Sequence, residues 1–168
     1  MKVTFALVLL LLLLSFTINY AYGQEPVIME QVSDNGRVKV RLFWPEVLPD
    51  QLYNIELRFL NPQSNEPIID SIIYNIAVMQ DEDSIEVYTN QRTEDGKALF
   101  EVVFPEDGTG PAQVIVVITG MGFGTTWTNM NERVVFNVQV VPEFSTLAVM
   151  VLSFSIATVL ALSRFKTR

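Results

Sequence analysis

Apolar and polar residues alternate with a period of two through the middle of this 168-residue chain. In the segment 38–42, valine and leucine occupy every second position between basic residues, and 52–60 repeats the pattern with aromatic and aliphatic residues. Because successive side chains of a β-strand point to opposite faces, this pattern predicts strands with one buried and one solvated face. Seven strands, rich in β-branched or aromatic residues, are predicted in all: 38–42, 52–60, 68–79, 85–89, 99–104, 114–118 and 134–140.

Turn-forming residues separate these strands, and no segment between them has helical spacing. Glu94-Asp95-Gly96 predicts a tight reversal in which Gly96 takes the positive φ that a hairpin requires. Short strands at regular intervals without helices predict an all-β fold, an immunoglobulin-like antiparallel β-sandwich of about seven strands. A small barrel is the alternative. The chain has no cysteine, so the disulfide of antibody domains cannot form.

Both ends of the chain are apolar, and each predicts a targeting segment. At the N-terminus an apolar run, 5–16, follows Lys2, and the small residues Ala21 and Gly23 come next. This arrangement predicts a secretory signal peptide, 1–23, that is cleaved after Gly23. An uncleaved anchor is the alternative, but the run is shorter than the roughly 20 residues that span a bilayer.

At the C-terminal end, 145–163 is a run of 19 uncharged and mostly apolar residues. Its length predicts a transmembrane helix. The tail that follows, 164–168, carries three basic residues. Because positive charges stay on the cytoplasmic side, we expect this tail inside the cell and the domain 24–141 outside, held at the cell membrane.

Pro142, Glu143 and Phe144 precede the predicted helix. The motif, the apolar helix and the basic cluster, in this order, resemble the PEF-type C-terminal sorting signal of archaeal surface proteins. The resemblance implies that an archaeosortase, a membrane-embedded enzyme, cuts near the motif and transfers the protein to a new anchor. Ser145 stands where many members of that family have glycine. An ordinary junction between a stalk and the membrane, with a helix-breaking proline, is the alternative.

The middle of the chain carries a second resemblance. The segments 74–78, 93–96 and 138–141 are similar to parts of the sandwich domains that precede such sorting signals. The similarity extends over residues 37–144 and consists of strands and turns. It implies the same sandwich that the alternation predicts.

The domain 24–141 is strongly acidic. It holds 18 of the 19 acidic residues and 7 of the 11 basic residues, which is a net charge of −11. Such a field repels phosphate backbones, so we expect no nucleic-acid partner. The whole chain contains no histidine and no cysteine. Thiol nucleophiles, Ser-His and Cys-His dyads and the usual zinc, copper and haem ligands are therefore excluded.

We predict that the protein is not an enzyme, because the sequence contains no catalytic signature. Pairs of carboxylates suited to glycoside hydrolysis remain available by residue type. However, a sandwich of about 118 residues leaves little wall for a substrate cleft.

The densest acidic cluster consists of Asp81, Glu82 and Asp83, on a predicted loop. Hard cations take oxygen ligands, so this cluster is a candidate calcium loop. It lacks the glycine and the spaced acids of an EF-hand loop. A solvated turn is the alternative.

The segment 120–127 holds three alternating glycines followed by a tryptophan. A glycine-rich loop bearing aromatic residues is suited to a shallow site for a sugar or a partner strand. Gly122, Phe123, Gly124 and Trp127 are therefore candidate partner-binding residues. The alternative is a mobile loop with an aromatic side chain packed against the core.

Together these observations predict a membrane-anchored cell-surface protein that presents a non-enzymatic immunoglobulin-like domain for interaction or structural support. The expected partners are the membrane, an archaeosortase, and an envelope or extracellular protein or glycan. The alternative is a calcium- or small-ligand-binding surface module, with calcium the one cofactor considered.

Overall fold

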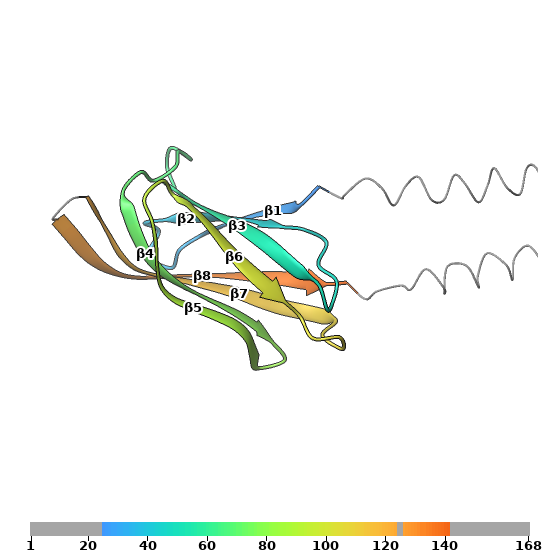
Figure 1. The fold of residues 1–168 in the computed structure, drawn as a ribbon. Coiled ribbons are helices and arrows are strands. Elements are labelled where there is room, and N and C mark those ends of the chain that lie inside the picture. Colours follow the sequence, from blue (N-terminus) through green and yellow to red (C-terminus); the bar gives the residue numbers. More distant parts are fainter. Residues whose placement is uncertain (1–24, 124–125, 142–168) are drawn as a thin grey trace, which may run out of the picture.

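Eight β-strands and no helix make up the residues that the computed structural model describes, 25–123 and 126–141 (Figure 1). The strands are β1 (Val27–Val32), β2 (Lys39–Trp44), β3 (Leu52–Leu60), β4 (Ser71–Gln80), β5 (Asp83–Thr93), β6 (Lys97–Val103), β7 (Gly110–Phe123) and β8 (Thr126–Val140). The prediction of an all-β fold is confirmed. Within the described ranges no helix is long and apolar enough to cross a membrane. The predicted signal peptide, sorting motif, transmembrane helix and basic tail lie outside those ranges.

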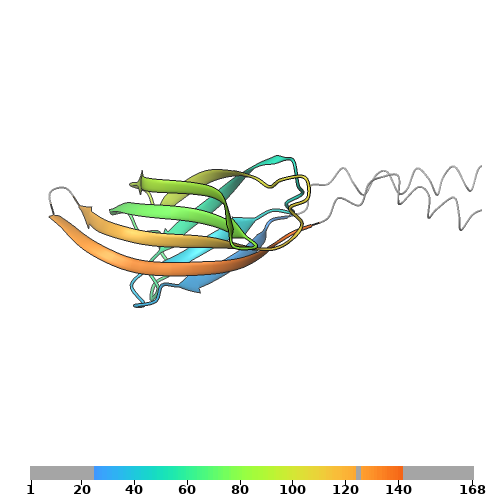
Figure 2. The ribbon, with the colours of Figure 1, turned by 90° about the horizontal axis from the view of Figure 1, so that it is seen from below.

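The strands form two antiparallel sheets of four. One has the order β1-β2-β3-β6 and the other the order β5-β4-β7-β8. The two sheets pack face to face as a β-sandwich (Figure 2). The chain changes sheet after β3, after β5 and after β6, so that β3 pairs with β6 and β4 pairs with β7. These two non-local pairs bring strands from both halves of the domain into each sheet, with β6 at the edge of the first and β4 and β7 at the centre of the second.

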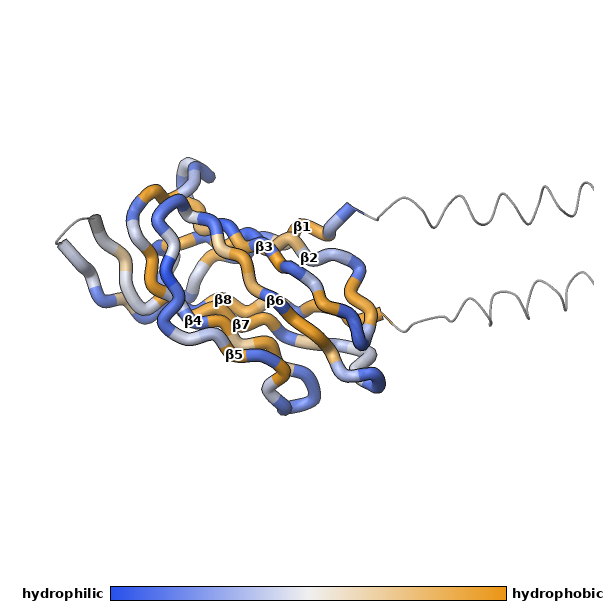
Figure 3. Tube along the Cα trace, viewed as in Figure 1, coloured by the Kyte–Doolittle hydropathy of each residue, from blue (hydrophilic) through white to orange (hydrophobic). Residues whose placement is uncertain are grey.

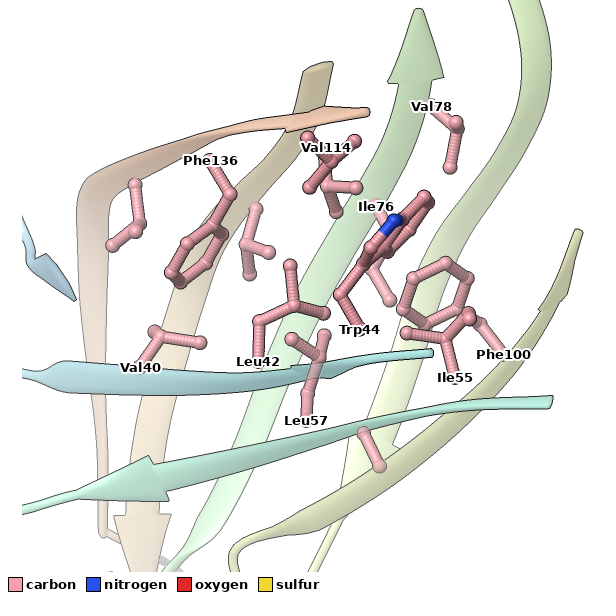
Figure 4. Packing of buried hydrophobic residues seen from close by; sticks show 14 of the residues in the cluster. Val40, Leu42, Trp44, Ile55, Leu57, Ile76, Val78, Phe100, Val114 and Phe136 are labelled. Atoms are coloured by element: carbon pink, nitrogen blue, oxygen red, sulfur yellow. The ribbon is translucent and has the colours of Figure 1, made fainter. Parts of the chain in front are cut away.

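The core lies between the inner faces of the sheets, where apolar side chains from both interdigitate (Figure 4). Colouring by hydropathy shows apolar residues along the strands and polar residues in most turns (Figure 3). Trp44 is buried at the end of β2, and its indole nitrogen donates a hydrogen bond to the carbonyl of Gln139 on β8, at 3.1 Å. The ring also meets Phe104 edge to face, with centroids 6.3 Å apart. One side chain thus joins both sheets and satisfies its own polar atom.

The two ends of the described domain lie at the same end of the sandwich. β1 begins and β8 finishes there, while the β7–β8 hairpin extends from the opposite end (Figures 1 and 2). A parallel bridge between Val47 and Val140, and a hydrogen bond from the Val141 amide to the Val47 carbonyl, hold the last residues of β8 against the β2–β3 loop.

The structure adds an eighth strand to the seven predicted. β1 runs along the edge of its sheet and pairs only with β2, so nearly all of its side chains are exposed. A strand without a buried face shows no alternation of apolar and polar residues, which is why sequence reasoning missed it. The other predicted strands are present, but β5, β7 and β8 are longer than predicted because pairing with neighbours carries them past the apolar segments.

Candidate functional site

The glycine-rich segment is a strand hairpin and not the loop that the sequence predicted. β7 continues through Gly120 and Gly122, which pair with Asn129 and Trp127 on β8. Backbone pairing needs no side chain, so alternating glycines are compatible with a strand. Of the candidate residues, Gly122 and Phe123 lie in β7 and Trp127 in β8, while Gly124 lies outside the described residues.

Trp127 lies across the outer face of sheet β5-β4-β7-β8, where the glycines leave room for it. A Cβ atom on Gly120 would stand 3.7 Å from the indole ring. The guanidinium of Arg92, on β5, lies over the same ring at 5.4 Å from the centroid, and it also contacts Ser71 at 3.0 Å and Glu94 at 2.9 Å. Because 39% of Trp127 remains exposed, this end of the sandwich offers an aromatic surface edged by charge.

The acidic cluster Asp81-Glu82-Asp83 forms a two-residue hairpin turn between β4 and β5. Gln80 pairs with Asp83, and the two central residues have φ values of 48° and 74°. All three acids are exposed. Within the described ranges no three acidic side chains come together in a group that could hold a metal ion. The candidate calcium loop is thus a hairpin turn, and calcium binding by it stays a prediction.

This turn yields a prediction about stability. A hairpin turn with two positive φ angles favours Asn-Gly or Asp-Gly, and Glu82 occupies the glycine position. Replacing Glu82 with glycine relieves the left-handed strain of a long side chain, and we expect the free energy of unfolding to rise by roughly 0.5–1 kcal/mol in a denaturant titration. Asp83→Gly, one residue later in β5, is the matched control and should lower stability. A loss in both variants would contradict the strain argument.

Glu132 is a buried carboxylate that the sequence analysis did not single out. It is 1% exposed, on the inner face of β8. The Ser33 hydroxyl donates to it at 2.6 Å and the Asn35 amide at 3.2 Å, and the Arg37 guanidinium lies 3.6 Å away. These partners belong to the β1–β2 turn, so Glu132 connects the two sheets along one side of the sandwich. The available sequence signal was an acidic residue at a position where the alternation of β8 otherwise places apolar residues.

The pKa of Glu132 is lowered from its ordinary value. Loss of solvation on burial raises it, but the hydrogen bonds from Ser33 and Asn35 and the charge of Arg37 together outweigh that effect. Glu132 is therefore a charged carboxylate at neutral pH, held by donors rather than exposed to a substrate. The arrangement is that of a structural link.

Basic residues gather on the outer face of sheet β1-β2-β3-β6. Arg41, Arg58 and Lys97 stand directly opposite one another on three adjacent strands. Like charges in register repel, and two carboxylates offset the repulsion: Glu30 pairs with Arg41, and Glu56 with Arg58. The hydrogen bond from Arg41 holds the pKa of Glu30 below its ordinary value. The charges on this face are largely balanced within it.

Comparison with known proteins adds no relative. No protein-family model, no curated protein and no solved structure matches the chain.

Proposed function

We propose that this chain is a membrane-anchored cell-surface protein whose β-sandwich presents the β7–β8 hairpin to an extracellular partner and catalyses no reaction. The observation that carries the proposal is the placement of the domain ends. Both lie at one end of the sandwich, opposite the hairpin (Figures 1 and 2). An anchor after residue 141 makes the hairpin the part farthest from the membrane.

We infer that the sandwich is of the immunoglobulin-like type. With β3, β4, β6 and β7 taken as strands B, C, E and F, strand B neighbours E in one sheet and C neighbours F in the other, as in that fold. β5 and β8 then take the places of C′ and G, and β2 that of A. β1 is an additional edge strand.

The polar groups of the domain support a binding role over catalysis. The buried carboxylate of Glu132 is taken up by structural donors, and Glu30 is paired with Lys39 and Arg41. Burial raises the pKa of the Tyr74 hydroxyl above its ordinary value of 10, so this hydroxyl is not a base at neutral pH. These groups act in packing and in ion pairs, whereas Trp127 is a large aromatic side chain that is open to a partner.

Single cysteines test the topology, because the chain contains none of its own. Thr128→Cys lies on the exposed part of β8, and Thr167→Cys lies in the predicted tail. On intact cells, a membrane-impermeant maleimide should label the first variant, and the second only after lysis. Labelling in the opposite pattern would contradict the proposed orientation. Mass spectrometry then distinguishes the two anchors, since a C-terminus near Phe144 indicates sorting and an intact Arg168 a lasting transmembrane helix.

The partner surface is tested by Trp127→Ala in the full chain. Truncating an exposed aromatic contact residue should weaken binding to isolated cell-envelope material by roughly tenfold, in the range of a hot-spot residue. Leu52→Ala is the matched control, since Leu52 is 60% exposed on the outer face of the other sheet. Equal binding by the two variants would exclude the hairpin as the contact site.

A further inference from the structure

The outer face of sheet β5-β4-β7-β8 carries a continuous apolar row. The register places Val87, Ala77, Ile115 and Val135 side by side, one from each strand. Val87 is 55% exposed, and the other three are half-buried by their neighbours in the sheet. The sandwich covers only the opposite, inner face of this sheet. A solvent-facing row of this kind is unusual for a sandwich, whose outer positions are typically polar.

Several strands of this sheet are richer in apolar residues than one buried face requires. β7 contains five consecutive apolar residues, 114–118, and β4 and β8 contain shorter runs, 76–79 and 134–136. The hydropathy colouring shows apolar stretches along these strands (Figure 3). In the other sheet, β3 alternates in sequence, with Asn54, Glu56 and Arg58 at its outward-facing positions. Near-continuous apolar strands are typical of sheets covered on both sides, and alternating strands of sheets covered on one.

Charged side chains are also scarce on this outer face. The domain holds 18 carboxylates, but among the described residues none lies at an outward-facing position of β4, β5, β7 or β8. The charged residues at those positions are Arg92 and Arg133, on the two edge strands. Depletion of charge at the centre with basic residues toward the rim is the composition of a protein–protein interface.

We propose that two copies of this chain associate through the outer faces of their β5-β4-β7-β8 sheets. Charge favours a second copy, because two domains of net charge −11 repel wherever carboxylates face each other, and the described outward-facing positions of these four strands hold none. Size favours it as well. Without the hairpin residues 120–129, the four strands contribute 10 or 11 residues each, which at about 3.3 Å per residue and about 4.8 Å between strands give a face of about 650 Å². This lies within the range of standard interfaces, which bury about 600–1,000 Å² per partner.

The association has the geometry of two sheets packed face to face, about 10 Å apart, related by a two-fold axis. Ala77 and Ile115, on the two central strands, lie nearest the middle of the interface. The pairing goes beyond the proposed function, because it leaves the distal hairpin free for another partner and does not depend on the membrane anchor.

Oligomeric mass tests the proposal. The full chain, purified in detergent, should sediment as a dimer at micromolar concentration, and Ile115→Glu should halve the protein mass because it places a carboxylate at the centre of the interface. Leu99→Glu is the control, since Leu99 is 70% exposed on the outer face of the other sheet, and this variant should remain dimeric. A monomeric wild type, or dimers in both variants, would overturn the proposal. Circular dichroism and melting verify that each variant is folded.

A cross-linking experiment covers the case in which Ile115→Glu fails to fold. Ala77→Cys introduces the single thiol of the chain with little change in volume. A short thiol-to-thiol cross-linker should trap it as a covalent dimer, and Leu99→Cys should stay monomeric under the same conditions. Failure of Ala77→Cys to cross-link, or more efficient cross-linking of Leu99→Cys, would overturn the proposed dimer.

Discussion

Replacing Glu132 with alanine should lower the free energy of unfolding by about 2–4 kcal/mol, because the buried Ser33 hydroxyl and the Asn35 amide lose their acceptor and a cavity forms. Glu132→Gln keeps the volume and one acceptor oxygen, so it should cost about 1 kcal/mol, the difference between a charge-assisted and a neutral hydrogen bond. Glu106→Ala, at an exposed position, is the control and should change little. Denaturant titration at pH 7 measures all three.

The same residue makes stability depend on pH. The pKa of Glu132 is lower in the folded state than the ordinary 4.5 that it regains on unfolding. The contribution is therefore fully present above about pH 4.5 and is lost as the pH falls through the folded-state pKa. Wild type should lose stability in this acid range more steeply than Glu132→Gln. Parallel curves for the two proteins would mean that Glu132 carries no charge-dependent stabilisation.

A Ser33→Ala exchange separates the energy of the hydrogen bond between Ser33 and Glu132 from the cost of the cavity that Glu132→Ala creates. If the hydrogen bond between Ser33 and Glu132 is the main link, the double variant should be less destabilised than the sum of the two single variants. Strict additivity would assign the effect of Glu132→Ala to lost packing instead.

The second large effect is expected at Gly96, in the turn between β5 and β6. Its φ is +70°, and a Cβ atom would stand 2.6 Å from the carbonyl oxygen of Ile68 and 3.0 Å from that of Phe59. Both contacts are with backbone, so neither can be relieved by a rotamer change. Gly96→Ala should therefore lower the free energy of unfolding by roughly 2–5 kcal/mol, from the left-handed conformation and the displaced strand together.

Gly36 supplies the matched control. Its φ of +74° is nearly the same, but a Cβ atom there would meet nothing within 4 Å. Gly36→Ala should cost about 1–2 kcal/mol, the left-handed conformation alone. The difference between the two alanine variants in a denaturant titration measures the close approach of the backbone segments around Gly96. Equal losses would contradict that steric explanation.

Gly96 also shows which features of a turn can be predicted from local sequence. Its position after Glu94-Asp95 predicted a reversal with a positive φ, and the structure confirms both. The contacts with Ile68 and Phe59 could not be predicted, because they depend on how the chain between β3 and β4 folds back against the turn. Turn chemistry is local, whereas close packing around a turn is not.

The candidate sites follow the same division. The acidic turn was recognisable as a turn or loop, since short polar runs between apolar segments do not form strands. The glycine segment 120–127 was predicted as a loop because glycine is a poor strand former in isolation, but pairing with β8 and the overlying Trp127 make it a strand. Glu132 could not be assigned a role from sequence, because its partner Ser33 lies 99 positions away.

The period-two alternation by itself determined that the described domain is all-β and which side chains face inward, because the two faces of a strand are set by the geometry of consecutive residues. It did not determine which strands share a sheet. The pairings of β3 with β6 and of β4 with β7, the edge strand β1, and the apolar outer face of sheet β5-β4-β7-β8 were decided by the tertiary structure. The physical reason is the same for all of them. They depend on contacts between residues far apart in the chain, and a local sequence pattern does not report the free energy of such contacts.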